Sequence, residues 1–138
     1  MSTLEQKKEI ALAVSRAIMN GNWEKVDELL ADNFIYIGDG APAVNKQEYI
    51  GFMRGVLCAA RTGMDMKFLR VIAEGNLVAI EYTNEMTHTS DFFGVPATNK
   101  RVIGTGQFIR EVKNGKVTAE WQTTNALGLM RQLDAIPG

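Results

Sequence analysis

The stretch KRVIGTGQFIREVKNGKVTAEWQTTN, residues 100–125, decides the fold class. Asn114-Gly115 lies near its middle, between two long runs that are rich in β-branched and aromatic residues. An Asn-Gly pair supplies the two positive-φ positions that a two-residue hairpin turn requires. The pattern therefore predicts that residues 100–113 and 116–125 are neighbouring antiparallel strands.

The preceding segment predicts a second hairpin. Residues 65–74 and 76–88 flank Glu74-Gly75-Asn76, which is typical of a tight turn. Some of these strands are long, so bends or bulges are expected in them. Together the two hairpins predict a meander of four strands.

Residues before the meander have helical spacing instead. The predicted elements are a helix over 3–20, a short helix capped by Asn22, a strand over 34–37 and a helix over 46–61. Asn45 and Glu48 form a capping box at the start of the last of these helices. With a short helix over 126–134, the order of elements predicts an α+β domain.

A long curved antiparallel sheet around a helix leaves a cavity that suits a small apolar molecule. On the helix over 46–61, Tyr49, Phe52 and Met53 recur at helical spacing, so they are predicted to pack on the sheet and to line this cavity. Tyr36 adds a phenol that can donate a hydrogen bond into an apolar pocket.

Composition excludes several classes of protein. The 138 residues fit one domain, residues 1–138, and the net charge of −1 gives no electrostatic reason to expect nucleic acid or anionic lipid as a partner. One His and one Cys cannot form a Cys/His zinc site or an internal disulfide. The N-terminal residues do not have the pattern of a signal peptide, and no apolar run is long enough for a membrane span. We expect a soluble cytoplasmic protein without a metal or cofactor.

Six short segments between residues 87 and 133 resemble one known family. They are Thr87-His88-Thr89, Phe93-Gly94-Val95-Pro96-Ala97-Thr98, Gly115-Lys116-Val117, Glu120-Trp121, Ala126-Leu127-Gly128-Leu129-Met130 and Gln132-Leu133. In this order they resemble the SnoaL-like polyketide cyclase, or ester cyclase, family. The resemblance implies the cone-shaped α+β barrel shared with nuclear transport factor 2 and ketosteroid isomerase, in which three N-terminal helices pack on a curved, mainly antiparallel sheet. It also implies a homodimer through the outer face of the sheet.

One position departs from the family pattern. Members of the family carry an Asp four residues after the Trp, whereas here Asn125 follows Trp121 at that spacing. Strand alternation places both residues on one face, which the resemblance implies is the cavity face. An amide can orient a ligand but cannot carry a proton, so Asn125 is predicted to be a hydrogen-bonding residue of the site. The alternative is a polar residue that ends the strand.

His88 is then the main candidate for proton transfer, because an imidazole has an unperturbed pKa of about 6.5. The alternative is a structural His near a strand end. Gln107 is a further candidate polar residue of the pocket. By alternation Glu81, Glu85 and Glu120 fall on the opposite face, so they are predicted to be solvated or to lie at a subunit contact. Asp39 is predicted mainly to cap its loop.

Two classes of function fit these residues. The first is cofactor-independent cyclase or isomerase chemistry, in which His88 removes a proton next to a carbonyl while Asn125, Gln107 and Tyr36 donate hydrogen bonds. Trp121, Tyr49, Phe52 and Met53 would contact the substrate. The second is a non-catalytic protein that binds a small molecule, with epoxide hydrolysis as a weaker alternative on the same fold.

Overall fold

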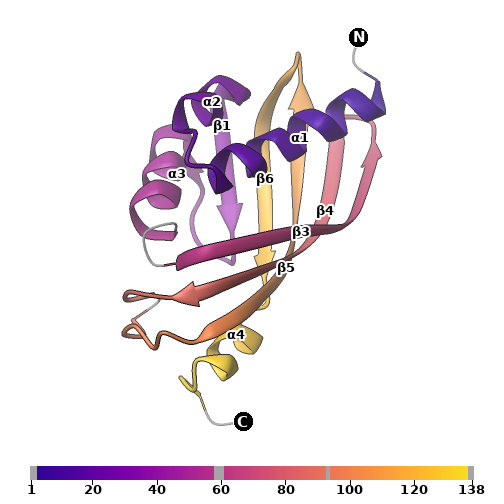
Figure 1. Ribbon diagram of the computed structural model, residues 1–138. Helices are drawn as coiled ribbons and strands as arrows, with labels where there is room; N and C mark the ends of the chain where they lie inside the picture. The colour runs from indigo at the N-terminus through magenta and orange to yellow at the C-terminus, as the bar shows by residue number, and fades with distance from the viewer. Residues whose placement is uncertain (1–2, 58–60, 93, 137–138) are drawn as a thin grey trace.

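The computed structural model describes residues 3–57, 61–92 and 94–136. The chain forms α-helices and β-strands in the predicted α+β order (Figure 1). The helices are α1 (Leu4–Met19), α2 (Trp23–Leu29), α3 (Lys46–Phe52), the π-helical turn η1 (Met53–Leu57) and α4 (Ala126–Gln132). The strands are β1 (Leu30–Gly38), β2 (Val44–Asn45), β3 (Arg61–Glu74), β4 (Leu77–His88), β5 (Arg101–Lys113) and β6 (Lys116–Thr124).

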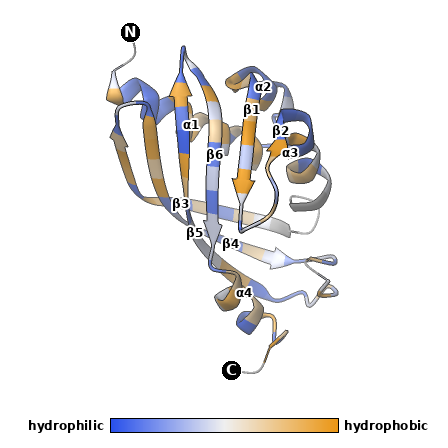
Figure 2. Cartoon of the chain, turned by 180° about the vertical axis from the view of Figure 1, so that it is seen from behind, coloured by the Kyte–Doolittle hydropathy of each residue, from blue (hydrophilic) through white to orange (hydrophobic). Residues whose placement is uncertain are grey.

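All six of these strands form one sheet in the order β2-β1-β6-β5-β4-β3. Neighbouring strands are antiparallel except for β1 and β6, which are parallel. The sheet is strongly curved, and α1, α2 and α3 lie on one of its faces (Figure 1). Seen from the other side, strands β1, β6 and β5 carry no helix in front of them (Figure 2). The helices therefore enclose one face of the sheet and leave the other uncovered.

Local capping sets the starts of the helices as predicted. The side chain of Asn22 accepts a hydrogen bond from the Lys25 backbone N–H at the start of α2. Asn45 and Glu48 form the predicted capping box of α3, with Glu48 N–H donating to Asn45 Oδ1 at 2.9 Å. At the turn between β5 and β6, Asn114 has φ 52° and Gly115 has φ 76°, the positive values that such a turn requires.

The helix predicted over 46–61 is shorter than expected. Its α-helical part ends at Phe52, continues as η1 to Leu57, and gives way to β3 at Arg61. The interior glycines Gly51 and Gly55 weaken a helix by about 1 kcal/mol each relative to Ala. The end of the prediction, residues 58–60, lies outside the described residues.

A β-bulge in β6 changes which side chains face the helices. Val117 pairs with Val112 and Ala119 pairs with Glu111, so Thr118 is an extra residue opposite the regular strand β5. One inserted residue reverses the alternation of the side chains beyond it. As a result Glu120 is 1% exposed, whereas Trp121 is 38% exposed on the uncovered face.

Two groups of buried apolar residues stabilise the fold. The larger lies between the helices and the sheet and includes Val14, Val26, Phe34 and Ile80. The smaller brings residues of β4, β5 and α4 together and consists of Met86, Phe92, Val102, Leu129 and Leu133. Within the described residues, no helix is long and apolar enough to cross a membrane.

Candidate functional site

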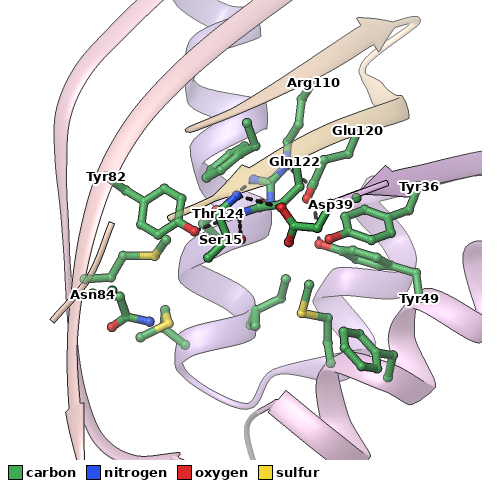
Figure 3. A pocket seen from close by; sticks show the side chains of 18 of the residues that line it. Ser15, Tyr36, Asp39, Tyr49, Tyr82, Asn84, Arg110, Glu120, Gln122 and Thr124 are labelled. Atoms are coloured by element: carbon green, nitrogen blue, oxygen red, sulfur yellow. Dashed lines mark hydrogen bonds and ion pairs between the residues drawn. The ribbon is translucent and has the colours of Figure 1, made fainter. Parts of the chain in front are cut away.

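A cavity of about 320 Å³ lies between the covered face of the sheet and the helices. Its wall is mainly apolar, with Phe52 and Met53 on the helical side and Met66, Met86 and Phe108 on the strands. Figure 3 labels its polar side chains, and they come from both layers. These are Ser15, Tyr36, Asp39, Tyr49, Tyr82, Asn84, Arg110, Glu120, Gln122 and Thr124.

An ion pair between Arg110 and Glu120 forms the charged end of the cavity. The two residues are partners across β5 and β6, and Arg110 Nε donates to Glu120 Oε1 at 2.6 Å. Arg110 Nη1 also donates to the Ala11 carbonyl at 2.6 Å and to Ser15 Oγ at 2.8 Å. The guanidinium lies 4.2 Å from the centroid of the Phe108 ring. Arg110 is thus fixed between α1 and the sheet.

The surroundings keep Arg110 charged. Burial alone would lower the pKa of its guanidinium, but the Glu120 carboxylate and Tyr49 outweigh this effect, so the pKa of Arg110 is raised. A buried ion needs such compensation, because leaving one charge without its partner is strongly destabilising. The pair therefore holds a fixed carboxylate against the cavity.

The two oxygens of Glu120 have different environments. Oε1 accepts hydrogen bonds from Arg110 and from the Tyr49 hydroxyl, the latter at 3.2 Å. Oε2 is equally buried, but no described residue donates a hydrogen bond to it. A buried polar atom without a partner costs about 1–3 kcal/mol and more when charged. Since Glu120 lines the cavity, a donor group on a bound ligand would satisfy Oε2.

Two tyrosines flank this carboxylate. The rings of Tyr36 and Tyr49 lie 4.9 Å apart between their centroids. Burial raises the pKa of the Tyr36 hydroxyl above its usual range, and the charges of Glu120 and Asp39 raise it further. Burial also raises the pKa of Tyr49, and Glu120 adds to the effect. Both phenols therefore remain protonated donors at neutral pH.

Gly38 allows the Tyr36 ring to adopt this position. A Cβ atom at residue 38 would lie 2.3 Å from the Tyr36 hydroxyl oxygen and 2.6 Å from its Cζ. Such distances are far below van der Waals contact, so the ring needs a glycine beneath it. The pairing of β1 with β6, in which Tyr36 is the partner of Glu120, then brings the phenol beside the carboxylate.

The remaining polar groups lie away from the ion pair. Gln122 Nε2 donates to the Tyr82 hydroxyl at 2.7 Å. Asp39, which was predicted mainly to cap its loop, lines the cavity, and its Oδ1 accepts from the Thr124 backbone N–H of β6 at 2.7 Å. Asn84 is 5% exposed, and its Oδ1 has no hydrogen-bond partner among the described residues. Its amide nitrogen has only a weak contact of 3.9 Å with a methionine sulfur.

Four of the predicted site residues do line the cavity: Tyr36, Tyr49, Phe52 and Met53. Two others do not. Trp121 and Gln107 lie on the uncovered face, where Gln107 contributes to an open groove of about 350 Å³. The predicted cavity position of Trp121 is wrong because the bulge at Thr118 reverses the alternation of β6.

Asn125 also lies outside the cavity, contrary to the prediction. It follows the last residue of β6 and caps α4, with its Oδ1 accepting the Gly128 backbone N–H at 3.0 Å. The alternative interpretation, a polar residue that ends the strand, is the one that the structure supports. The side chain is exposed and borders the open outer groove.

His88 is buried but is not among the residues that line the cavity. Its Nδ1 accepts the Thr98 backbone N–H at 3.2 Å and lies 3.0 Å from Thr98 Oγ1. The ring meets Phe92 edge-on, with 6.4 Å between centroids. The structure thus places His88 beside Phe92 of the smaller apolar group, where its hydrogen bonds to Thr98 fix the segment between β4 and β5.

Sequence reasoning missed the charged centre of the site. Glu120 was expected to be solvated or at a subunit contact, and the structure shows that it is buried and paired. One sequence signal could have indicated this centre. Arg110 lies two residues after Phe108, so strand alternation puts the arginine on the same inward face as an apolar residue. Nowhere in the described ranges do three His, Cys, Asp or Glu side chains lie close enough to hold a metal ion.

Comparison with known proteins agrees with this architecture. The sequence matches the SnoaL-like polyketide cyclase family over residues 8–133. The fold is similar to that of AclR from Streptomyces galilaeus, with a TM-score of 0.87, 21% identity and coverage of 98% of this chain and 100% of that one. It is also similar to TsrD from Streptomyces laurentii, with a TM-score of 0.86, 17% identity and coverage of 99% and 100%.

An epoxide hydrolase has the same fold. This protein, an LEH-like enzyme of M. tuberculosis, has a TM-score of 0.75 and 20% identity, with coverage of 96% of this chain and 92% of its own. No curated protein sequence matches the chain. These identities are low, so the structural similarities establish the fold and not the reaction.

Proposed function

Because the chain belongs to the SnoaL-like polyketide cyclase family, we propose that its cavity binds a small, largely apolar, polyketide-like molecule and performs acid–base chemistry on it without a cofactor. The observation that carries this proposal is the free oxygen Oε2 of Glu120, buried at the wall of an apolar cavity. The volume of about 320 Å³ is within the range of small-molecule sites.

Glu120 is the proposed base. Its Oε2 removes a proton from a carbon next to a ligand carbonyl. The electron pair of the C–H bond becomes the C=C bond of the enolate, and the π pair of the carbonyl moves onto its oxygen. The protonated phenol of Tyr36 donates a hydrogen bond to that oxygen. Stabilisation of an enolate by a phenol beside a carboxylate base is established chemistry in ketosteroid isomerase.

The same groups complete an aldol-type ring closure. The enolate carbon attacks a second carbonyl of the same molecule, which forms a C–C bond and an alkoxide. The carboxylic acid of Glu120 then returns its proton to the alkoxide, so no oxidant, reductant or metal is consumed. Arg110 acts as a positioning residue, because it binds Oε1 and leaves Oε2 without a partner.

The second candidate is a non-catalytic binding protein. Arg110 and Tyr49 both donate to Glu120 Oε1. The negative charge of the carboxylate is therefore balanced before any ligand binds, and such a carboxylate can accept a hydrogen bond from a ligand without taking part in a reaction. Epoxide hydrolysis is a weaker alternative, because Arg110 is the only cation in the described cavity wall and its Nε and Nη1 already donate to Glu120 and α1.

Deuterium exchange separates these candidates without knowledge of the natural ligand. With the bicyclic ketone 2-tetralone in heavy water, the wild-type protein should catalyse incorporation of deuterium next to the carbonyl. Glu120→Gln should lower this rate at least about a hundredfold, the usual contribution of a general base. The matched control Glu85→Gln changes a carboxylate outside the cavity and should keep the rate. Binding of the ketone without exchange by the wild type would favour the binding protein.

We also propose that the uncovered sheet face forms a homodimer. Strand pairing aligns one apolar row across five strands: Ile37, Trp121, Ile109, Ala79 and Ile72. Ile72 is 64% exposed and Ile109 39%, so the row meets solvent in a single chain. A second copy of this chain would cover it with the same row.

Light scattering tests this assembly. The wild type is expected to be a dimer at micromolar concentration, and Ile109→Lys, at the centre of the row, a folded monomer. A monomeric wild type would refute the homodimer.

A further inference from the structure

Two buried acceptor atoms of the cavity wall lack partners, and they lie far apart. Oε2 of Glu120 and Oδ1 of Asn84 receive no hydrogen bond from any described residue. Both residues line the same cavity and are at most 5% exposed. Buried acceptors are nearly always satisfied by protein, water or ligand. Two acceptors without partners in one cavity therefore indicate where a bound molecule would place its hydrogen-bond donors.

The strand register gives their separation. Glu120 on β6 pairs with Arg110 of β5, and Asn84 on β4 pairs with Gly104 of β5. Six residues along one strand correspond to roughly 20 Å between Cα positions at about 3.3 Å per residue, less where the sheet curves. Figure 3 shows the two side chains on opposite sides of the cavity. A ligand that reaches both must be elongated.

The wall between the two atoms is apolar. Met86, Gly104 and Phe108 line this part, and Gly104 leaves room because a Cβ there would come within 3.1 Å of the Met86 methyl group. The middle of the ligand therefore has little opportunity for hydrogen bonding. Its polar groups belong at its ends.

The charges of the wall select against anions. Its charged residues are Arg110, Glu120 and Asp39, which leaves one net negative charge among the described residues. Nε and Nη1 of Arg110 already donate to Glu120, Ala11 and Ser15, so the charge of the one cation in the described wall is balanced by Glu120 and not by a ligand. An anionic group at the Glu120 end would face a carboxylate oxygen that has no other partner.

From these contacts we infer that the ligand is an elongated, uncharged, apolar molecule with a hydroxyl-type donor at each end, one bonded to Glu120 Oε2 and the other to Asn84 Oδ1. Asn84 is then a specificity-determining residue. This inference rests on the proposed binding function but not on its chemistry, because Asn84 takes no part in the proton transfer.

Three trans-stilbene probes test the inference by fluorescence titration. They carry a para hydroxyl on both rings, a para hydroxyl on one ring, or a para carboxylate on both rings. The wild type should bind the dihydroxy probe roughly tenfold tighter than the monohydroxy probe, the usual effect of satisfying one buried acceptor. The dicarboxylate should bind at least tenfold more weakly than either.

Asn84→Leu removes the distal acceptor at similar volume, and it should abolish the preference for the second hydroxyl while retaining the monohydroxy probe. Thr83→Val, the neighbouring residue on the uncovered side of β4, should keep the preference. Equal affinities of the two hydroxylated probes for the wild type, a preference that survives Asn84→Leu, tight dicarboxylate binding, or no binding of the dihydroxy probe at millimolar concentration would each overturn the inference.

Ketone exchange separates this inference from the proposed function. Thr83→Val, outside the cavity wall, is expected to leave deuterium incorporation into 2-tetralone unchanged, whereas Glu120→Gln lowers it at least about a hundredfold. A protein that binds the probes as expected but exchanges no deuterium would retain the ligand class and lose the reaction.

Discussion

Arg110 and Glu120 face one another across the β5–β6 hairpin, with 2.6 Å between Nε and Oε1 and at most 2% of either residue exposed. The contact places a carboxylate in an apolar cavity and ties it to α1 through Ala11 and Ser15. Desolvating two charges is expensive, and an apolar pair of similar size is often as stable. The pair is therefore better explained by what Glu120 does in the cavity than by stability alone.

Breaking this pair should destabilise the protein strongly. Arg110→Met leaves the Glu120 carboxylate buried and without its cation, which should lower the free energy of unfolding by about 3–5 kcal/mol. Urea denaturation measures the change. The exposed pair Arg70–Glu81 supplies the control, since Arg70→Met should cost at most about 1 kcal/mol. Equal costs for the two variants would contradict the account of the buried pair.

The buried tyrosines predict a loss of stability at alkaline pH. In the unfolded chain a tyrosine ionises near pH 10, whereas the folded protein holds the pKa of Tyr36 and Tyr49 above that value. The unfolded state then binds fewer protons than the folded state above about pH 10, so the contribution of these groups is constant below that pH and falls as pH rises further. Tyr36→Phe should make the alkaline decline less steep.

The ultraviolet absorbance of tyrosinate gives a direct measurement. Of the three tyrosines in the chain, Tyr36 and Tyr49 should ionise only together with unfolding. Ionisation of all three in protein that is still folded by circular dichroism would show that the cavity is more solvated than the structure indicates.

Gly38 should control the position of the Tyr36 phenol. In Gly38→Ala the new Cβ would lie 2.3 Å from the Tyr36 hydroxyl, so the ring must move away from Glu120. We expect deuterium exchange into 2-tetralone to fall by roughly tenfold, because the enolate loses a donor. Gly51→Ala is the matched control, since a Cβ there meets nothing within 4 Å and should leave exchange unchanged. Full exchange by Gly38→Ala would remove Tyr36 from the proposed reaction.

Asn125 should contribute to stability and not to the reaction. Because it caps α4, Asn125→Ala should cost about 1 kcal/mol, whereas Asn125→Asp should be within a few tenths because Asp is an equally good cap. Thermal denaturation and ketone exchange can be measured on the same samples. A strong rise of exchange in Asn125→Asp would instead assign this position to the site.

The fold was accessible from sequence because its turns and caps are local. Asn114-Gly115 sets its hairpin turn through backbone conformations that few other residues adopt, and Asn45 and Glu48 satisfy the first turn of α3 by themselves. Helical spacing predicted that Tyr49, Phe52 and Met53 pack on the sheet, and the expected fold, in which this helix is a wall of the cavity, predicted that they line it. Each of these signals acts over a few residues.

The charged centre was not accessible, because it depends on a bulge. An extra residue at Thr118 is stabilised by its neighbour across the hairpin, where Thr118 Oγ1 donates to Glu111 Oε1 at 2.7 Å. Alternation along β6 gives no sign of this tertiary effect, and yet it moves Glu120 into the cavity and Trp121 out of it. The same reversal explains why alternation along β6 wrongly places Glu120 on the face opposite the cavity.

The most direct test compares the two proton carriers, Glu120 and His88. Deuterium incorporation into 2-tetralone is measured for Glu120→Gln and His88→Gln, each normalised to the folded fraction. The structure predicts a loss of at least about a hundredfold for Glu120→Gln and a rate near wild type for His88→Gln, whose imidazole lies outside the cavity wall. A wild-type rate in Glu120→Gln together with a loss in His88→Gln would contradict the assignment of Glu120 as the base.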